Sequence, residues 1–391
     1  MLTERVTASG RATAILRDLV SIESVNPFYP GGERGEVAMT AYVEDFLKRL
    51  GLAPERQEVL PKRENVFARI DAPNATRTLL FDSHMDTVSI EPVGRSMLDP
   101  RERDGRMTGR GSCDTKASLA AMLAAVETLT KRREELRANV VVLGSVDEEY
   151  LMRGIVAFAE RGQPIDAAVV GEPTRLAVVR AHKGLIRWEI ATHGKAAHTS
   201  QPQNGDNAIL QMMEVIAAFQ ALEPKLAART HPLLGRPYFT IATVHGGMGV
   251  NIVPEQCTIT VDRRTLPAEN AADVIAEVEG VLADLRQRSP NVKVEIGAPF
   301  ANIAGLDTPD DHPFVRLATR VAAEHGGADR AVGVPYGTNA AALAAKNIPT
   351  VVLGPGDIAQ AHSADEWVEL AQVERCAELY AHLALAYGAD S

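Results

Sequence analysis

A histidine and an aspartate stand two positions apart at the end of an apolar stretch that has the character of a β-strand. The stretch covers residues 79–81 and is followed by His84 and Asp86. If the strand continued that far, its alternation would place both side chains on one face. His84 could then bind a metal ion while Asp86 orients its imidazole ring. An exposed loop histidine beside an unrelated acid is the simpler alternative.

Further residues that can ligate metals follow other apolar strands of the sequence. They are the acidic run 147–149, Glu172 and His362, while Asp114 lies in a glycine-rich loop. In open α/β sheets, ligands gather at the carboxyl ends of the strands. Carboxylate and imidazole groups together suit zinc. The two adjacent glutamates of the acidic run favour a metal site, because their charges repel unless a cation neutralises them.

Each of these residues also has an ordinary structural explanation. Asp114 could cap the helix that is predicted directly after it. Glu172, which precedes a proline, could lie in a solvated turn, and His362 could be a surface histidine. Taken singly these explanations are the simpler ones, but the set of residues at strand ends favours a metal site.

Composition indicates an acidic globular protein. The 391 residues are enough for two domains with sizeable cores. A net charge of −10 argues against a nucleic-acid-binding protein and mildly favours cationic small ligands. Three cysteines imply no disulfide framework. Residues 1–5 lack the apolar core of a signal peptide, and the longest near-apolar run, 117–126, is about half of the ~20 residues that a membrane span needs. We therefore expect a cytoplasmic protein that binds neither nucleic acid nor membranes.

The order of the predicted elements indicates an inserted domain. Helices and strands alternate up to residue 180, and this α/β pattern returns after residue 310. Residues 181–297 instead read strand, helix, strand, strand, helix, strand, an α+β module of its own. The predicted helices are 12–22, 37–50, 116–130, 208–222, 271–286, 312–324, 340–346 and 369–387, and the predicted strands are 66–70, 79–82, 140–146, 167–170, 186–191, 239–244, 257–263, 292–296 and 350–353. We expect one domain of residues 1–180 and 298–391, with 181–297 inserted into it.

A series of sequence blocks resembles, in type and order, those of the dinuclear zinc amidohydrolases. This metallopeptidase family includes acetylornithine deacetylase, succinyl-diaminopimelate desuccinylase, aminoacylase and glutamate carboxypeptidase. The matching blocks are residues 83–86, 109–114, 147–149, 171–174, 193–198, 253–255 with 262–264, and 354–362. The resemblance covers essentially the whole chain. It implies an α/β fold, with a zinc-peptidase-like catalytic domain whose mixed sheet is flanked by helices, and an inserted α+β lid, residues 181–297, through which a homodimer forms.

The resemblance also implies two Zn²⁺ ions per subunit, for which Co²⁺ can substitute. One ion would be held by His84, Asp114 and Glu172, and the other by Asp114, Glu149 and His362. Asp114 would bridge the two ions, which its two oxygens allow at a metal separation of about 3.5–4 Å. Three carboxylates against two divalent ions leave a net positive charge, which can polarise a carbonyl.

Catalytic roles follow from the same resemblance. Glu148 corresponds to the general base, which takes a proton from the attacking water and later gives it to the leaving amine. Asp86 would orient His84. His198, in the insert, corresponds to a hydrogen-bond donor to the tetrahedral oxyanion. Without the resemblance, His198 would be interpreted as a surface loop histidine.

The remaining matches correspond to substrate contacts. Asn251 and Arg264 would hold the oxyanion or the α-carboxylate of the substrate, Arg264 as a bidentate clamp. An arginine in a strand is more often simply solvated. Gly337 and Thr338 correspond to a loop that binds the same carboxylate. Asn339 stands where many relatives have aspartate, which leaves the substrate preference open.

The implied reaction is hydrolysis of the amide bond of an N-acyl amino acid. Residues 354–362 look closest to the acetylornithine deacetylase branch, and the acidic chain suits a product with an additional amine. A succinyl-diaminopimelate desuccinylase and a glutamate carboxypeptidase-like metallopeptidase acting on short peptides are the alternatives within the family. A non-catalytic metal-dependent binding protein is the alternative from another class, but it would have no need of Glu148.

Overall fold

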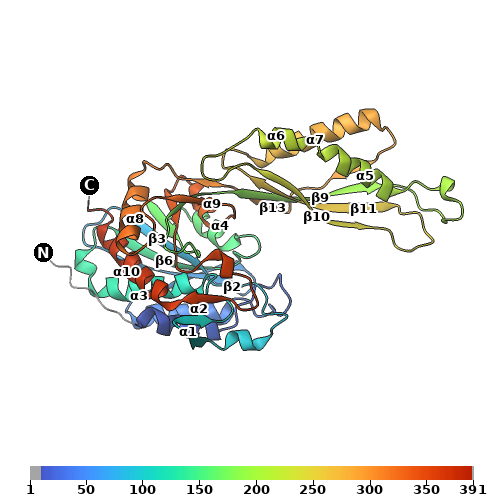
Figure 1. Ribbon diagram of the computed structural model, residues 1–391. Coiled ribbons are helices and arrows are strands. Elements are labelled where there is room, and N and C mark those ends of the chain that lie inside the picture. Colours follow the sequence, from blue (N-terminus) through green and yellow to red (C-terminus); the bar gives the residue numbers. More distant parts are fainter. Residues whose placement is uncertain (1–9, 390–391) are drawn as a thin grey trace. The chain divides into compact units, whose positions relative to one another are not determined.

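The computed structural model describes residues 10–389, which divide into two compact units (Figure 1). The first unit contains the chain up to Arg180, residues 308–333 and the chain from Thr338 onwards. The second unit contains Ala181–Asp307 and Val334–Gly337. Residues 1–5, on which the expected absence of a signal peptide was based, lie outside the described residues.

A mixed β-sheet forms the centre of the first unit. Its strands follow the order β1-β2-β6-β3-β7-β16-β8. Their bounds are β1 (Glu55–Leu60), β2 (Arg63–Ile70), β3 (Thr78–His84), β6 (Asn139–Ser145), β7 (Ala167–Val170), β8 (Val179–His182) and β16 (Thr350–Val352). β6, β3, β7 and β16 run parallel to one another. β3 and β6 are buried along their whole length, as expected for strands covered on both faces.

Helices pack on both faces of this sheet (Figure 1). One layer contains α1 (Arg11–Ser21), α2 (Val37–Arg49), α3 (Lys116–Lys131), α8 (Pro313–Glu324) and α10 (Leu370–Ala386). These helices share one apolar core with Val66 and Ala68 of β2. Phe67, which alternates with them and faces the opposite way, packs against Phe158 of α4 (Arg153–Glu160). The predicted α/β class, a mixed sheet flanked by helices, is confirmed.

A smaller sheet on the first unit joins distant parts of the chain. It contains β4 (Arg101–Arg103), β5 (Arg106–Thr108) and β17 (Trp367–Glu369) in the order β17-β5-β4. A further short helix, α9 (Ala340–Ala344), contacts β7 and β16. Among residues 10–389, no helix combines the length and the apolar character needed to cross a membrane.

The second unit is built on an antiparallel sheet of its own. The order is β10-β11-β9-β12, and β13 also pairs with β9. The strands are β9 (Gly184–His193), β10 (Tyr238–Gly246), β11 (Gln256–Thr265), β12 (Val294–Ile296) and β13 (Ala301–Ile303). The helices α5 (Ala208–Phe219), α6 (Leu222–Ala227) and α7 (Ala271–Arg288) share an apolar core with this sheet. The unit continues beyond residue 297 because β13 pairs with β9, and because β14 (Leu306–Asp307) pairs with Ala181 and His182, the two residues of β8 that belong to the second unit.

Some element predictions were wrong. The single helix expected at 208–222 is two helices, α5 and α6. Pro224 explains the break, because it has no N–H to donate to the carbonyl of residue 220 and its ring clashes with that group in a continuous helix. β1 and α4 had no predicted counterpart. β1 is the outermost strand of its sheet and has no buried residue. Its run Glu55-Arg56-Gln57-Glu58 therefore lacks the alternation of apolar and polar residues by which a strand is predicted.

Candidate metal centre

Five of the predicted ligand and catalytic side chains converge at one edge of the parallel strands. β3 ends at His84, the turn after β6 carries Glu148 and Glu149, the segment after β7 carries Glu172, and the segment after β16 leads to His362. Because parallel strands present their carboxyl ends at the same edge, residues far apart in sequence meet there.

Asp114 lies between two histidines and faces each with a different oxygen. Its Oδ1 is 3.1 Å from Nε2 of His84, and its Oδ2 is 3.2 Å from Nε2 of His362. The N-cap of α3 is Thr115, and within the described part of the chain no side-chain hydrogen bond caps that helix. The alternative of Asp114 as a helix cap is therefore wrong, and its carboxylate is placed to serve two positions.

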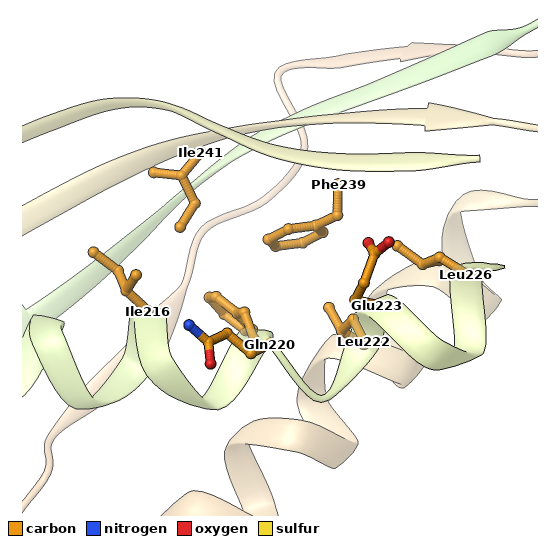
Figure 2. Close-up of a pocket in the computed structure, with 8 residues that line it drawn as sticks. Ile216, Gln220, Leu222, Glu223, Leu226, Phe239 and Ile241 are labelled. Carbon is orange, nitrogen blue, oxygen red and sulfur yellow. The ribbon is translucent and has the colours of Figure 1, made fainter. Parts of the chain in front are cut away.

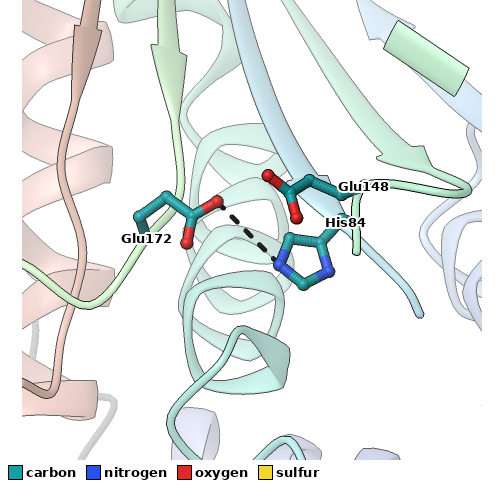
Figure 3. Close-up of side chains that lie close together, drawn as sticks. All are labelled: His84, Glu148 and Glu172. Atoms are coloured by element: carbon teal, nitrogen blue, oxygen red, sulfur yellow. Dashed lines mark ion pairs between the residues drawn. The ribbon is translucent and has the colours of Figure 1, made fainter. Parts of the chain in front are cut away.

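Glu172 lies close to the His84 ring. Oε1 of Glu172 is 3.9 Å from Nε2 of His84. Glu172 is only 4% exposed, so it is not a solvated turn residue. Figure 3 shows the carboxylates of Glu172 and Glu148 both directed toward the region beside the His84 ring. Ligand atoms of these three residues lie within 4.8 Å of one another.

Glu149 lies close to the His362 ring. Nε2 of His362 is 3.2 Å from Oε2 of Glu149. The side chain of His362 is 52% exposed, yet it contacts two carboxylates and is not an isolated surface histidine. The backbone of His362 has φ 58°, in the left-handed region. Such strain costs about 1–3 kcal/mol in a non-glycine residue and is concentrated at functional sites.

Burial shifts the pKa values of the carboxylates in this cluster. It raises the pKa of Glu148 and of Glu172 well above the ordinary range, and that of Glu149 to about 7, with nearby acids adding to the effect. Burial acts in the same direction on Asp114, but hydrogen bonds to His362 and His84 hold its pKa low. Buried acids gathered in this way are costly unless a cation neutralises them. The imidazole and carboxylate donors therefore fit divalent cations such as zinc.

Asp86 contacts both His84 and the acidic turn, which is formed by residues 147–149. Nδ1 of His84 is 3.0 Å from the backbone oxygen of Asp86 and 3.6 Å from its carboxylate. That carboxylate accepts hydrogen bonds from the N–H groups of Glu148 and Glu149, both at 3.1 Å. β3 ends at His84, so the expected strand alternation does not extend to Asp86. Asp86 thus ties the end of β3 to the turn that carries both glutamates.

Asn26 belongs to the same support and was missed in the sequence. Its Nδ2 donates to Oδ2 of Asp86 at 2.7 Å and to Oδ1 of Asp147 at 3.1 Å. Asp147 also has a left-handed φ of 70°, directly before Glu148. In the sequence, Asn26 followed by Pro27 indicates only a helix break. No local pattern shows that this asparagine reaches the acidic turn.

In the second unit, His198 and Asn251 lie on neighbouring segments. His198 pairs with Ile252 in an isolated bridge, and the N–H of Thr199 donates to the backbone oxygen of Asn251 at 3.1 Å. Both side chains are exposed, and Nδ1 of His198 is 2.8 Å from Oγ of Ser200.

Arg264 lies near the opposite end of β11. Its Nε is 2.8 Å from Oδ1 of Asp262. A Cβ built on Gly337 would lie 3.4 Å from the backbone oxygen of Lys183, so the Gly337 loop packs on that backbone. Burial and the nearby Arg264 lower the pKa of Lys183, a buried cation that sequence reasoning did not single out.

Thr338 and Asn339 are buried in the first unit. Oγ1 of Thr338 accepts a hydrogen bond from the N–H of Ala340 at 3.2 Å. Nδ2 of Asn339 donates to Asp82 at 2.9 Å and to Ser145 at 3.0 Å. The asparagine at 339 therefore contacts buried polar groups of the central sheet, where an aspartate would face the carboxylate of Asp82.

A separate pocket of about 300 Å³ lies between α5, α6 and β10 (Figure 2). Its lining is mostly apolar and consists of Ile216, Phe219, Gln220, Leu222, Glu223, Leu226, Phe239 and Ile241. Glu223 is the one ionisable side chain in this lining. The pocket therefore lacks the clustered acids and histidines that the edge of the parallel strands provides.

Comparisons with solved structures show the same fold. A tripeptidase from Staphylococcus aureus aligns with a TM-score of 0.78 and 18% identity, covering 96% of this chain and 97% of that one. A metallo-carboxypeptidase of the M20 family from Sulfolobus solfataricus aligns with a TM-score of 0.76 and 18% identity, over 96% and 99%. A dinuclear metal-binding peptidase of the M20 family from Bacillus subtilis aligns with a TM-score of 0.71 and 19% identity, over 96% and 97%.

Comparisons of sequence show the family. An acetylornithine deacetylase from Proteus mirabilis is 31% identical over 377 residues, which is 94% of this chain and 95% of that protein. One from Yersinia pseudotuberculosis is 32% identical over 381 residues, with the same coverage of each. The model of peptidase family M20/M25/M40 matches residues 80–386. The chain therefore belongs to peptidase family M20/M25/M40 and is a metal-dependent amidohydrolase.

Proposed function

We propose that the protein hydrolyses N²-acetylornithine to acetate and ornithine. The observation that carries this proposal is the cluster in which Asp114 faces both His84 and His362, with Glu148 beside them. Curated relatives that match 94% of the chain are named acetylornithine deacetylase, which favours this substrate over the succinylated and peptide alternatives. The net charge of −10 suits a substrate with a cationic side chain.

The metal ligands in this proposal are His84, Asp114 and Glu172 at one position and Asp114, Glu149 and His362 at the other. Two zinc ions held there would supply positive charge that polarises the amide carbonyl and makes the attacking water more acidic. Cobalt would be able to replace zinc, because it accepts the same nitrogen and oxygen donors.

Glu148 is the proton carrier in the proposed reaction. It takes a proton from the attacking water and returns it to the departing amine. The carboxylate of Asp86 holds the N–H of Glu148 at 3.1 Å and so fixes the backbone from which this side chain extends. His198 and Asn251 donate hydrogen bonds to the oxyanion.

Arg264, Gly337 and Thr338 hold the α-carboxylate of the substrate in this proposal. Replacing Arg264 by alanine should raise KM strongly for substrates with a free α-carboxylate and much less for their amides, which carry no anion to clamp. KM values for N²-acetylornithine and its α-amide, measured on both proteins, provide the check. An equal rise for acid and amide would remove Arg264 from the carboxylate site.

The substrate is tested by assaying one zinc-loaded preparation on three compounds side by side. We expect kcat/KM to be highest for N²-acetylornithine, compared with N-succinyl-diaminopimelate and a γ-glutamyl dipeptide. A higher value for either of the others would move the assignment to that branch of the family. Metal binding without hydrolysis of any amide would indicate a non-catalytic binding protein.

We also propose that the second unit forms a homodimer. Among the strands of residues 10–389, β10 is at the edge of its sheet, so its outer backbone groups are available to pair with another strand. Leu210 and Met213 on α5, Val244 on β10 and Met248 after it are exposed apolar side chains. An apolar surface beside an unpaired strand edge is typical of an association site.

The length of β11 supports a shared active site in such a dimer. Asn251 and His198 lie beyond the start of β11 at Gln256, and Arg264 lies next to its last residue. From Gln256 to Arg264 the strand spans roughly 26 Å at its usual rise per residue. One substrate molecule cannot bridge that distance. In this proposal, His198 and Asn251 therefore serve the active site of the partner, while Arg264 serves its own.

Mixing two inactive variants tests this arrangement. His198→Ala and Glu148→Ala homodimers, unfolded together and reassembled, should recover about a quarter of wild-type activity, because about half of the dimers are mixed and each has one intact site. Wild-type protein treated in the same way is the control. If the mixture stays as inactive as its parents, His198 acts within its own chain or has no catalytic role.

A cytoplasmic location completes the proposal. Cys113, Cys257 and Cys376 are all buried and free, which suits a reducing compartment.

A further inference from the structure

The carboxylate of Glu366 collects the hydrogen-bond donors of the loop that carries Asp114. Its Oε1 accepts from the N–H groups of Cys113 at 2.9 Å and Asp114 at 3.0 Å. Its Oε2 accepts from the N–H of Gly111 at 3.0 Å and from the guanidinium of Arg110 at 2.6 Å. Glu366 is 1% exposed. One buried carboxylate thus satisfies four donors of a single loop.

Glu366 also belongs to the segment that supplies His362, four residues earlier. Directly after Glu366, β17 pairs with β5, which precedes the Asp114 loop. The backbone oxygen of Glu366 accepts from the N–H of Gly109 at 3.0 Å. The two segments that provide Asp114 and His362 are therefore joined both by the backbone and by the buried side chain of Glu366.

The joined segments place two ligand atoms at a spacing that suits one ion. Nε2 of His362 and Oδ2 of Asp114 are 3.2 Å apart. Neighbouring ligands on a tetrahedral zinc ion with bonds of about 2.0 Å are about 3.3 Å apart. If the Glu366 carboxylate is lost, buried N–H groups of the loop are left without an acceptor, and the loop must shift to find others.

We propose that Glu366 is a positioning residue that sets the separation of Asp114 and His362, and thereby the affinity of the metal position that these two share with Glu149. The proposal rests on the metal centre proposed above and does not depend on the identity of the substrate. Glu366 was not among the residues that the sequence singled out. None of those residues accepts the hydrogen bonds that the backbone N–H groups of the Asp114 loop donate to Glu366.

Metal binding by the metal-free protein tests the role of Glu366. Protein freed of metal by a chelator is titrated with Co²⁺, and the absorption of the bound ion is followed. Glu366→Gln keeps the size of the side chain but turns an NH₂ group toward donors. We expect one of the two binding steps to weaken by about 10–100-fold, as is usual when a supporting group of a metal site is lost. His362→Ala, which removes a ligand, identifies that step.

Two variants serve as controls. Glu369→Gln changes an acid three residues after Glu366, at the end of β17, whose side chain is 44% exposed and 3.9 Å from Arg106, and it should bind both ions as wild type does. Arg110→Gln removes one donor and leaves the three backbone donors, so it should weaken the same step less than Glu366→Gln does.

Two outcomes would overturn the proposal. In one, Glu366→Gln binds both ions with wild-type affinity. In the other, it weakens both steps equally and also loses the thermal unfolding transition of the metal-free protein, which would make Glu366 only a folding residue. No substrate enters this experiment, so its failure leaves the proposed deacetylase reaction untouched. Failure of the substrate assay would likewise leave the role of Glu366 standing.

Discussion

Replacing Glu148 by alanine should lower kcat by about 10²–10⁴-fold, the usual contribution of a general base, while both metal positions remain filled. Among residues 10–389, no hydrogen bond or ion pair joins the carboxylate of Glu148 to another residue, whereas Asp114 and Glu149 each face a histidine. A carboxylate without a fixed partner is free to carry a proton between water and the leaving amine. Steady-state kinetics together with metal analysis of the purified variant provide the measurement.

The structure also supplies the competing interpretation for Glu148. Its ligand atom lies within 4.8 Å of those of His84 and Glu172, so Glu148 could itself be a ligand. Glu149→Ala is the matched control, because it removes the adjacent acid and should cost one metal ion. If Glu148→Ala loses an ion while Glu149→Ala keeps both, the roles of the two glutamates are reversed.

Replacing Asp114 by alanine should remove metal from both positions and abolish activity. The reason is that each oxygen of this carboxylate faces a different histidine, at 3.1 and 3.2 Å. Glu172→Ala should mainly empty the position shared with His84, since Glu172 lies 3.9 Å from that ring. Metal content per subunit, measured after dialysis against metal-free buffer, distinguishes the two variants. Equal losses of a single ion in both would show that Asp114 does not bridge.

Those residues of the candidate site that follow β-strands could be predicted from the sequence. The apolar runs of β3, β6 and β7 each lead within a few residues to a histidine or an acid, so His84, Glu149 and Glu172 were singled out with their strands. The parallel order of these strands then brings the residues together. In such cases, local pattern and general sheet topology contain the necessary information.

The supporting residues could not be predicted, because contacts between distant segments create their roles. Glu366 meets the loop of Asp114 across more than 250 positions, and nothing near it in sequence distinguishes it from the half-buried Glu369. Asn26 reaches Asp86 across 60 positions. The extension of the second unit beyond residue 297 could not be predicted either. Strands of two or three residues, such as β13 and β14, are too short to show an alternating pattern in the sequence.

Diffraction from crystals of the zinc-loaded protein, recorded at the zinc absorption edge, tests the central claim most directly. We expect two anomalous peaks about 3.5–4 Å apart on either side of the Asp114 carboxylate. His84 and Glu172 should complete the coordination of one ion, and Glu149 and His362 that of the other. A single peak, or two peaks of which one is coordinated by Glu148 in place of Glu172 or Glu149, would contradict the account.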